Sequence, residues 1–180
     1  MIIELHVMLA RVISVFLALI FLAAAWHKLQ HSLEFSGVVR NFKILPEWAV
    51  PAVSSLLPVV ELITGLGLFA GYMLSLMTTI AFILLAVFAV AIAINLLRGR
   101  SEIDCGCFRP ESRQHLSWFM VLRNIVLAFA ALYSSGVHAL YENATSLLII
   151  YPAAVGFAVL YFTTATVSSL VNSVKQQGSH

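Results

Sequence analysis

The stretch YMLSLMTTIAFILLAVFAVAIAINLL, residues 72–97, contains no charged side chain. A helix needs about 20 mostly apolar residues to cross the hydrocarbon core of a bilayer, so this stretch predicts a membrane-spanning helix. The whole chain of 180 residues has the same character, with 61% hydrophobic residues, 10% charged residues and a mean hydropathy of +0.98. A soluble domain carries about 25% charged residues. The composition therefore excludes a soluble globular domain.

Apolar stretches of similar length recur along the chain and predict an all-α, polytopic membrane helix bundle of about five transmembrane helices. We expect these helices at about residues 5–28, 48–71, 72–97, 116–136 and 147–171. They form a single predicted domain over residues 1–174, followed by a polar, disordered tail at 175–180. The first stretch lacks the compact basic leader of a signal peptide, so we interpret it as an uncleaved helix.

A mixed segment, QHSLEFSGVVRNFKILPEW at residues 30–48, follows the first predicted helix. Phe35, Val38, Val39 and Phe42 recur at roughly helical spacing in it. This pattern indicates a short amphipathic helix that lies in the membrane interface and ends before Pro46.

The second predicted helix ends in GLGLFAG, residues 65–71. Gly67 and Gly71 stand four positions apart, a spacing that allows a neighbouring helix to approach closely. Packing alone would explain these glycines.

Five helices place both long loops and the carboxyl terminus on one face of the membrane, opposite the amino terminus. The basic residues expected on that face are Lys28, Arg40, Lys43, Arg98, Arg100, Arg109, Arg113 and Lys175. Arg11 alone is expected on the other face. Basic loops favour the cytoplasmic side, so the first face is predicted to be cytoplasmic.

The only two cysteines of the chain, Cys105 and Cys107, flank Gly106 within RSEIDCGCFRPESR, residues 100–113. Thiol–disulfide exchange needs one thiolate to attack and a second to resolve the mixed disulfide. Glycine frees the backbone so that the two side chains can approach one another. The pattern favours a redox-active dithiol.

Charged neighbours tune this dithiol. Arg100, Arg109 and Arg113 favour the thiolate form of a nearby cysteine. Asp104 opposes them, although its carboxylate could shuttle a proton.

Three other interpretations of the cysteines remain open. They could be small buried apolar side chains, or a permanent disulfide, which would close almost no loop and stabilise little. They could also bind a metal with His115, but the pattern lacks the second ligand pair of a structural zinc site, so no metal is predicted.

Charged residues within the predicted helices mark a second candidate site, because charges inside a membrane are usually paired or functional. We expect Arg11 to contact Glu61, either as a structural ion pair or in proton or quinone handling. Arg123 and Asn124 lie about two turns into the fourth helix. Arg123 either extends to the interface or points inward to the thiolate, to Asp104 or to a ligand carbonyl.

His27 and His31 stand four positions apart, on one face if the first helix extends that far. A haem or metal pair and ordinary interfacial side chains are both compatible with this spacing, and the second is commoner.

Three blocks of sequence resemble a known family. NLLRGRSEIDCGCF (residues 95–108) joined to LSWFMVLRN (116–124) resembles the methylamine utilisation protein MauE. LPVVELITGLGLF (57–69) is similar to that family and to the broader DoxX-like membrane proteins. The likeness extends from about the first helix to the fourth. Arg109 departs from it, because it stands where the family usually has glycine.

The resemblance implies a multi-pass protein of the bacterial inner membrane that is needed to mature the small (β) subunit of methylamine dehydrogenase. That periplasmic subunit is rich in disulfides and carries a tryptophan tryptophylquinone cofactor. The resemblance also implies a thioredoxin-like partner, MauD. It maps the family's CGC onto Cys105 and Cys107, and its helix motif onto Arg123 and Asn124.

We therefore predict a membrane maturation factor that works with a MauD-like protein and that, if it is catalytic, is a thiol–disulfide oxidoreductase. A quinone is a candidate electron acceptor. A non-catalytic chaperone or scaffold is the alternative, and a small-molecule transporter is a weaker one. A net charge of +2 gives no indication of nucleic acid. The predicted cytoplasmic face of the dithiol conflicts with a periplasmic client.

Overall fold

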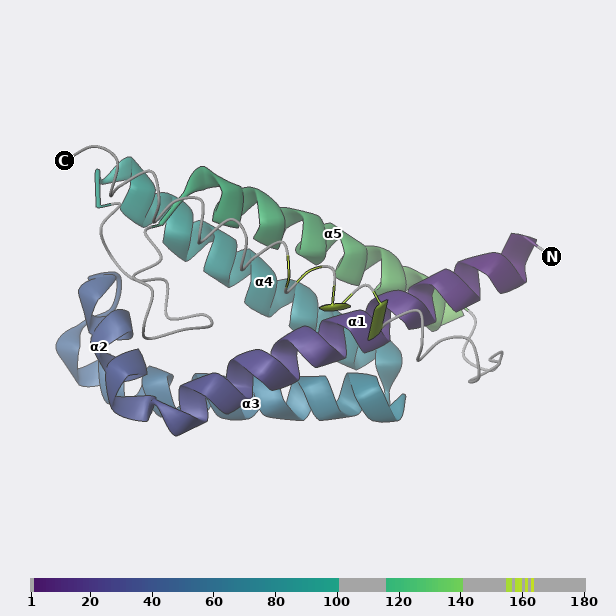
Figure 1. The fold of residues 1–180 in the computed structure, drawn as a ribbon, viewed down its shortest axis with the longest axis horizontal. Coiled ribbons are helices and arrows are strands. Elements are labelled where there is room, and N and C mark those ends of the chain that lie inside the picture. The colour runs from purple at the N-terminus through teal and green to yellow at the C-terminus, as the bar shows by residue number, and fades with distance from the viewer. Residues whose placement is uncertain are drawn as a thin grey trace.

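The computed structural model describes residues 2–100 and 116–140, together with Val155, Gly156, Ala158, Val159, Tyr161 and Thr163. The predicted helical membrane bundle is confirmed: four helices are long and apolar enough to span a membrane, and the described residues form no strand. The elements in order are α1 (Ile2–Gln30), α2 (Ser32–Asn41), the 3-10 turn η1 (Glu47–Ala49), α3 (Val50–Ala70), α4 (Leu74–Leu97) and α5 (Trp118–Leu140). Figure 1 shows their arrangement.

The observed helix ends differ from the predicted ones for local reasons. The predicted third helix starts two residues late, at Leu74, because Gly71 and Met73 both have positive φ and form the turn after α3. The helix predicted to end at Gly136 continues to Leu140, since glycine is tolerated within membrane helices. The six described residues between 155 and 163 are helical, whereas the rest of the predicted fifth helix and the tail lie outside the described residues.

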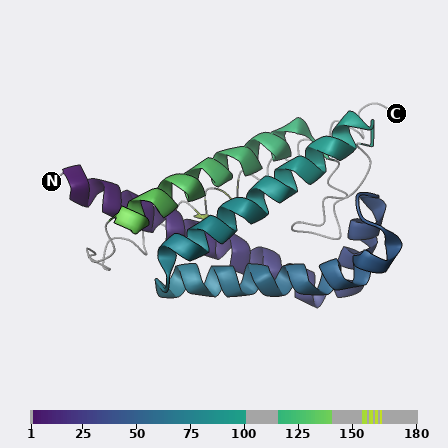
Figure 2. The ribbon, with the colours of Figure 1, turned by 180° about the vertical axis from the view of Figure 1, so that it is seen from behind.

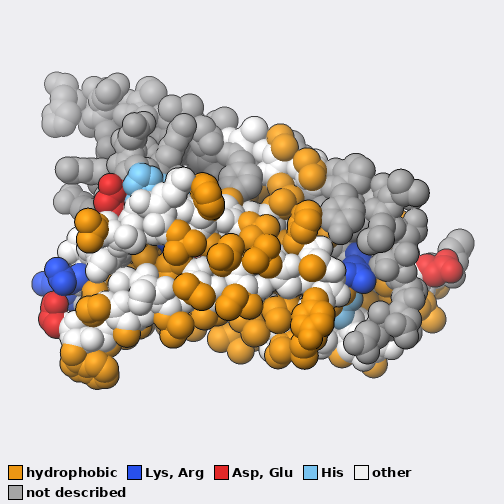
Figure 3. All heavy atoms as spheres, turned by 90° about the horizontal axis from the view of Figure 1, so that it is seen from below, with side chains coloured by type: hydrophobic (Ala, Val, Ile, Leu, Met, Phe, Trp, Pro, Cys, Tyr) orange, Lys and Arg blue, Asp and Glu red, His pale blue; other side chains and the backbone are white. Residues whose placement is uncertain are grey.

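Two helix pairs make up the bundle. α1 packs along α3, α4 packs along α5, and α1 also contacts α5 (Figures 1 and 2). Leu17, Leu68, Ala81 and Ala131 are buried in the core between them. Large apolar side chains also cover the outside, and Figure 3 shows them across the middle of one face with charged groups at its two ends. An apolar exterior is the surface that lipid requires.

Of the two glycines expected to allow close helix approach, Gly67 faces a neighbouring helix, whereas Gly71 caps α3 and faces the Arg11 side chain. A Cβ atom at Gly67 would lie 2.8 Å from the Met77 side chain of α4. One at Gly65 would lie 2.9 Å from Leu22 Cγ and 3.2 Å from the Leu22 backbone nitrogen of α1. The Leu22 backbone cannot move aside, so Gly65 sets how closely α3 approaches α1, whereas a side chain at Gly67 would require the flexible Met77 side chain to move.

The end of the bundle that carries α2 gathers the end of α1, the start of α3, the end of α4 and the start of α5; we call it the α2 end (Figure 1). The opposite, amino-terminal end carries the start of α1 and the α3–α4 turn. Arg98 Nη1 donates to the Lys43 carbonyl at 3.3 Å, and Arg100 Nη1 donates to the Asn41 carbonyl at 3.4 Å. For the described residues, the prediction that the two long loops share one end is confirmed.

The predicted amphipathic helix after α1 is observed as α2. It ends at Asn41, well before Pro46, because Lys43 adopts a positive φ of 47°. Phe35 is its buried side chain, whereas Leu33 is exposed. Phe35 is therefore the most deeply buried side chain of α2, and Val38 and Val39 are half-buried.

Candidate functional site

The predicted dithiol segment, residues 101–115, lies outside the described residues. It holds Asp104, Cys105, Gly106, Cys107 and Arg109, and also Arg113 and His115. Its two flanking residues, Arg100 and Leu116, are described. The structure therefore fixes where the segment leaves the bundle and where it returns.

The end of α4 directs the chain into the dithiol segment. Gly99 has φ 70°, and its N–H bonds the Leu96 carbonyl while the Arg100 N–H bonds the Asn95 carbonyl. This pair of bonds closes the helix in a Schellman motif, whose left-handed position favours glycine. The chain turns sharply just before the residue that begins the segment.

Two arginines then join this turn to α2. The side chains of Arg98 and Arg100 donate to the carbonyls of Lys43 and Asn41, at and just after the carboxyl end of α2. Cations are favourable at that end of a helix, where carbonyl groups lack partners. Arg100 was expected to favour the thiolate, and in the structure its side chain joins the residue before the dithiol segment to the carboxyl end of α2.

The return of the chain is fixed at the same end. Leu116 is buried with Ile92 of α4 and Val121 of α5, and Phe42 packs against this cluster. Both flanks of the dithiol segment therefore meet the bundle at the α2 end, within a few residues of the carboxyl end of α2.

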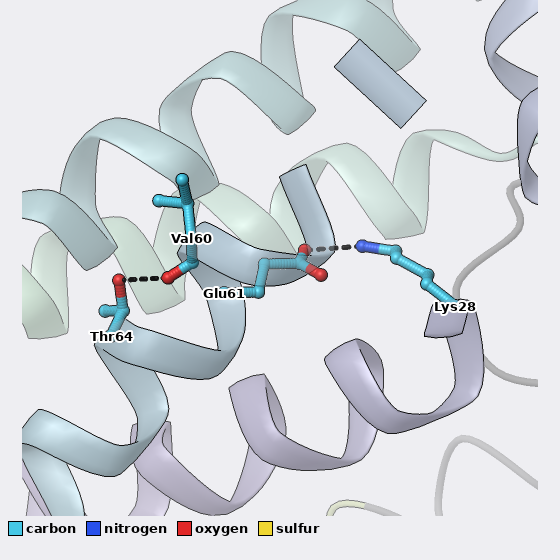
Figure 4. A network of polar contacts seen from close by, with 4 residues as sticks. All are labelled: Lys28, Val60, Glu61 and Thr64. Atoms are coloured by element: carbon cyan, nitrogen blue, oxygen red, sulfur yellow. Dashed lines mark hydrogen bonds and ion pairs between the residues drawn. The ribbon is translucent and has the colours of Figure 1, made fainter. Parts of the chain in front are cut away.

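A buried ion pair lies beneath α2. Lys28 Nζ of α1 bonds Glu61 Oε1 of α3, and the two side chains are only 3% and 1% exposed. Figure 4 shows them reaching toward one another, with Thr64 bonded to the Val60 carbonyl one turn away at 2.7 Å. Side chains on a helix point back toward its amino terminus, so Lys28 extends from the end of α1 into the bundle.

Aromatic rings complete the surroundings of this pair. Lys28 Nζ lies 5.1 Å from the centre of the Phe35 ring of α2 and 4.7 Å from that of Phe88 in α4. Both distances suit a cation–π interaction. Four elements, α1 to α4, thus each contribute one side chain to the site around the Lys28 ammonium.

The predicted contact between Arg11 and Glu61 is wrong. Glu61 pairs with Lys28, which follows Arg11 by 17 residues on α1, about 25 Å along the helix axis. Arg11 lies at the other end of the bundle, where a Cβ on Gly71 would come 2.7 Å from its Nη1. The prediction chose the partner of Glu61 from the expected depth of each residue in the membrane. It did not allow for the length of a lysine side chain that points into the bundle.

A second polar cluster lies near Arg11, between α1 and α5. Ser14 Oγ is 2.9 Å from Ser134 Oγ and 3.0 Å from His138 Nε2. Both serine hydroxyls donate to the Ala10 carbonyl, each at 2.9 Å. All three side chains are buried, and they bond to one another.

Four other predicted site residues belong to the described part of the chain, and no contact described there joins them to the ion pair. They are Arg123, Asn124, His27 and His31. Arg123 is half-buried with its guanidinium 5.6 Å from the Tyr161 ring centre, and Asn124 is buried on α5. The rings of His27 and His31 lie 4.9 Å apart. No group of three or more potential metal ligands occurs among the described residues.

Sequence reasoning counted Lys28 only among the basic residues of the loop face, and it missed the roles of the Phe35 and Phe88 rings. The available signal was the unpaired Glu61 in an apolar helix, because a buried carboxylate calls for a cation within reach. The cluster of Ser14, Ser134 and His138 gave no signal, since serine and histidine are common in membrane helices that pack against one another.

Comparison with known proteins identifies the family. The family model described as "Methylamine utilisation protein MauE" matches residues 6–136. The chain is 49% identical over 142 residues to methylamine utilization protein MauE of Paracoccus denitrificans, with 76% of each chain covered. It is 50% identical over 117 residues to the Paracoccus versutus protein of that name, covering 65% of this chain and 63% of the relative.

A third relative is the MauE protein of Methylorubrum extorquens, 46% identical over 119 residues, with 66% of this chain and 64% of the relative covered. No solved structure matches the chain.

Proposed function

The chain belongs to the methylamine utilisation protein MauE family, and on that premise we propose that it matures the small (β) subunit of methylamine dehydrogenase by thiol–disulfide exchange. It is a multi-pass membrane protein, and the family name assigns it a role in methylamine utilisation. The proposed reaction uses Cys105 and Cys107, and its proposed partner is a MauD-like protein of thioredoxin fold. The proposed location is the bacterial inner membrane.

The observation that carries the proposal is the pairing of the only two thiols, one glycine apart, in a segment fixed at both flanks to one end of the bundle. Cys105 follows Arg100 by five residues, so the chain can carry it at most about 18 Å from that anchor. Both described flanks, Arg100 and Leu116, lie at this one end of the bundle, which supports exchange with a client at that membrane surface.

The exchange between the client and the Cys105–Cys107 disulfide needs no further reagent. A client thiolate attacks one sulfur of the Cys105–Cys107 disulfide and forms a mixed disulfide, and the displaced cysteine leaves as a thiolate. The second client thiolate then attacks the mixed disulfide, which releases an oxidised client and a reduced dithiol. Run in reverse, with the partner as electron donor, the same steps would reduce or rearrange incorrect client disulfides.

The proposal is tested by replacing each cysteine singly, Cys105→Ser and Cys107→Ser, in cells that make methylamine dehydrogenase. We expect the disulfide-bonded small subunit to be lost in both variants, while the variant proteins remain in the membrane at normal levels. Ser55→Ala, which alters an exposed side chain of α3, is the control. Normal amounts of mature subunit in both variants would leave only a scaffold role.

The side of the membrane is tested with a thiol reagent that cannot cross it. Intact cells are labelled before and after mild reduction. Labelling that requires reduction indicates an oxidised pair that faces the periplasm, as a periplasmic client would need. Labelling only after the membrane is permeabilised supports the cytoplasmic side that the basic residues predict.

A further inference from the structure

We propose that Lys28, Glu61, Phe35 and Phe88 form the headgroup site of a lipid-soluble quinone that accepts the electrons of the dithiol. The inference rests on the proposed function, because Cys105 and Cys107 are the electron donor. The site itself is argued from the described residues alone.

The ion pair has hydrogen-bonding capacity that the described residues leave unused. An ammonium group has three N–H donors, and within the described chain Lys28 donates only to Glu61 Oε1. Glu61 Oε2 is buried and has no hydrogen-bond partner there either. Buried polar groups are nearly always satisfied, so the open carboxylate oxygen, beside an ammonium whose other neighbours are the Phe35 and Phe88 rings, indicates a missing polar ligand.

The chemistry of these open groups fits a quinone and its reduced form. A quinone carbonyl accepts a hydrogen bond, which an N–H of Lys28 supplies. A quinol hydroxyl donates one, which Glu61 Oε2 accepts. The rings of Phe35 and Phe88, 5.1 and 4.7 Å from Lys28 Nζ, are flat apolar surfaces suited to a flat ring.

The route to the site passes α2. Phe35 is the buried side chain of this ten-residue helix, and Gly37 near its middle has no atom within 4 Å of an added Cβ. We expect the Phe35 ring to turn aside to admit the ligand and then to pack on it, with no movement of a spanning helix. The same helix is bonded by Arg98 and Arg100 to the turn that begins the dithiol segment, so donor and acceptor share one end of the bundle.

The reaction is a two-electron, two-proton exchange. Two S–H bonds of the dithiol break and one S–S bond forms, which releases two electrons and two protons. The quinone takes up both electrons and both protons, and two O–H bonds form in the quinol. Lys28 holds the carbonyl oxygen that is reduced, and Glu61 hydrogen-bonds the hydroxyl that results.

The first experiment measures oxidation of the pre-reduced dithiol by decylubiquinone, with the full-length protein in lipid nanodiscs. Lys28→Met is expected to slow it by about tenfold or more, because a hydrogen bond from a charged donor is lost. Lys43→Met and Glu47→Gln change exposed side chains at the same end and should stay within about twofold of the unmodified protein. Equal rates in Lys28→Met and Lys43→Met would overturn the inference.

A charge-swapped variant, Lys28→Glu with Glu61→Lys, separates a ligand site from a purely structural ion pair. The swap keeps an ion pair, so the protein should fold, but it moves the donor to α3. We expect a folded protein with slow quinone reduction. Unchanged quinone reduction in this variant would show that the pair is only structural.

The second experiment locates the site without using the dithiol. An azido derivative of decylubiquinone is photolysed with the Cys105→Ser, Cys107→Ser double variant, and the labelled peptides are identified. We expect label on peptides that contain Phe35 or Phe88, and less label in Lys28→Met. Label elsewhere, or none, overturns the site. Because this variant has no dithiol, a failure here is distinct from failure of the maturation role, which the cysteine variants test in cells.

Discussion

At the amino-terminal end of the bundle, Ser14, Ser134 and His138 are buried and bond to one another and to the Ala10 carbonyl. At the α2 end, Lys28 and Glu61 are buried just as deeply, but one carboxylate oxygen has no partner within the described residues. Both clusters sit in an apolar bundle, where polar side chains are costly. Within the described residues the first cluster is hydrogen-bonded throughout, whereas the second leaves Glu61 Oε2 without a partner.

The contrast suggests that the two ends have different roles, one in helix packing and one in chemistry. A polar cluster that satisfies itself holds helices together, here α1 against α5. A cluster that leaves groups open, next to the flanks of the only two thiols, is suited to chemistry. Substitutions in the cluster at the amino-terminal end should therefore change stability alone. Substitutions at the α2 end should also change the dithiol chemistry or the yield of mature subunit.

The largest expected effect on stability comes from breaking the ion pair. Lys28→Met leaves a carboxylate buried without its cation, which should lower the free energy of unfolding by about 3 kcal/mol. The double change Lys28→Met with Glu61→Gln removes both charges and should recover much of that loss. Denaturation in detergent, followed by circular dichroism, measures both. If the single variant is as stable as the double variant, the carboxylate is not held by Lys28.

A matched pair of glycines compares the two ends directly. Gly71 and Gly99 have φ of 74° and 70°, so alanine at either should cost about 1 kcal/mol of backbone strain. Gly71→Ala also meets Arg11 Nη1, a flexible group that can move aside, whereas nothing lies within 4 Å at Gly99. We expect similar thermal stability in the two variants.

Their functional effects should differ, because Gly99 forms the turn that begins the dithiol segment. Gly99→Ala should lower the yield of mature small subunit, and Gly71→Ala should leave it unchanged. Equal yields from the two variants would mean that the geometry of this turn does not matter to maturation.

The smallest expected effect belongs to the satisfied cluster. Ser14→Ala removes hydrogen bonds to Ser134 and His138 and should cost about 0.6 kcal/mol, the typical value for polar contacts between membrane helices. Thermal unfolding in detergent measures the loss. Dithiol oxidation by decylubiquinone should stay normal in this variant, and a severe defect there would place chemistry at the amino-terminal end.

The helices could be predicted from sequence because apolar length is a strong local signal. The stretch at residues 72–97 gave α4 with an error of two residues at its start, where a turn depends on the φ angles of Gly71 and Met73. The shared end of the two loops also followed from helix order. Both inferences need only the chain direction and the length of each segment.

The partner of Glu61 could not be predicted in the same way. Arg11 and Lys28 both lie on α1, and only the relative depth of α1 and α3 decides which of them reaches the carboxylate. That depth is set by close packing, such as Gly65 against Leu22, which no single-helix pattern records. The rings around Lys28 come from α2 and α4, so the site exists only once four elements have met.

The most direct test of the central claim is covalent trapping of the exchange reaction. With Cys107→Ser, Cys105 can form a mixed disulfide that no second thiol resolves. The account predicts that this variant, purified under acidic quenching, carries a MauD-like protein or the small subunit in an adduct that reduction releases. Absence of an adduct from both Cys107→Ser and Cys105→Ser, in cells where the unmodified protein matures the subunit, would contradict it.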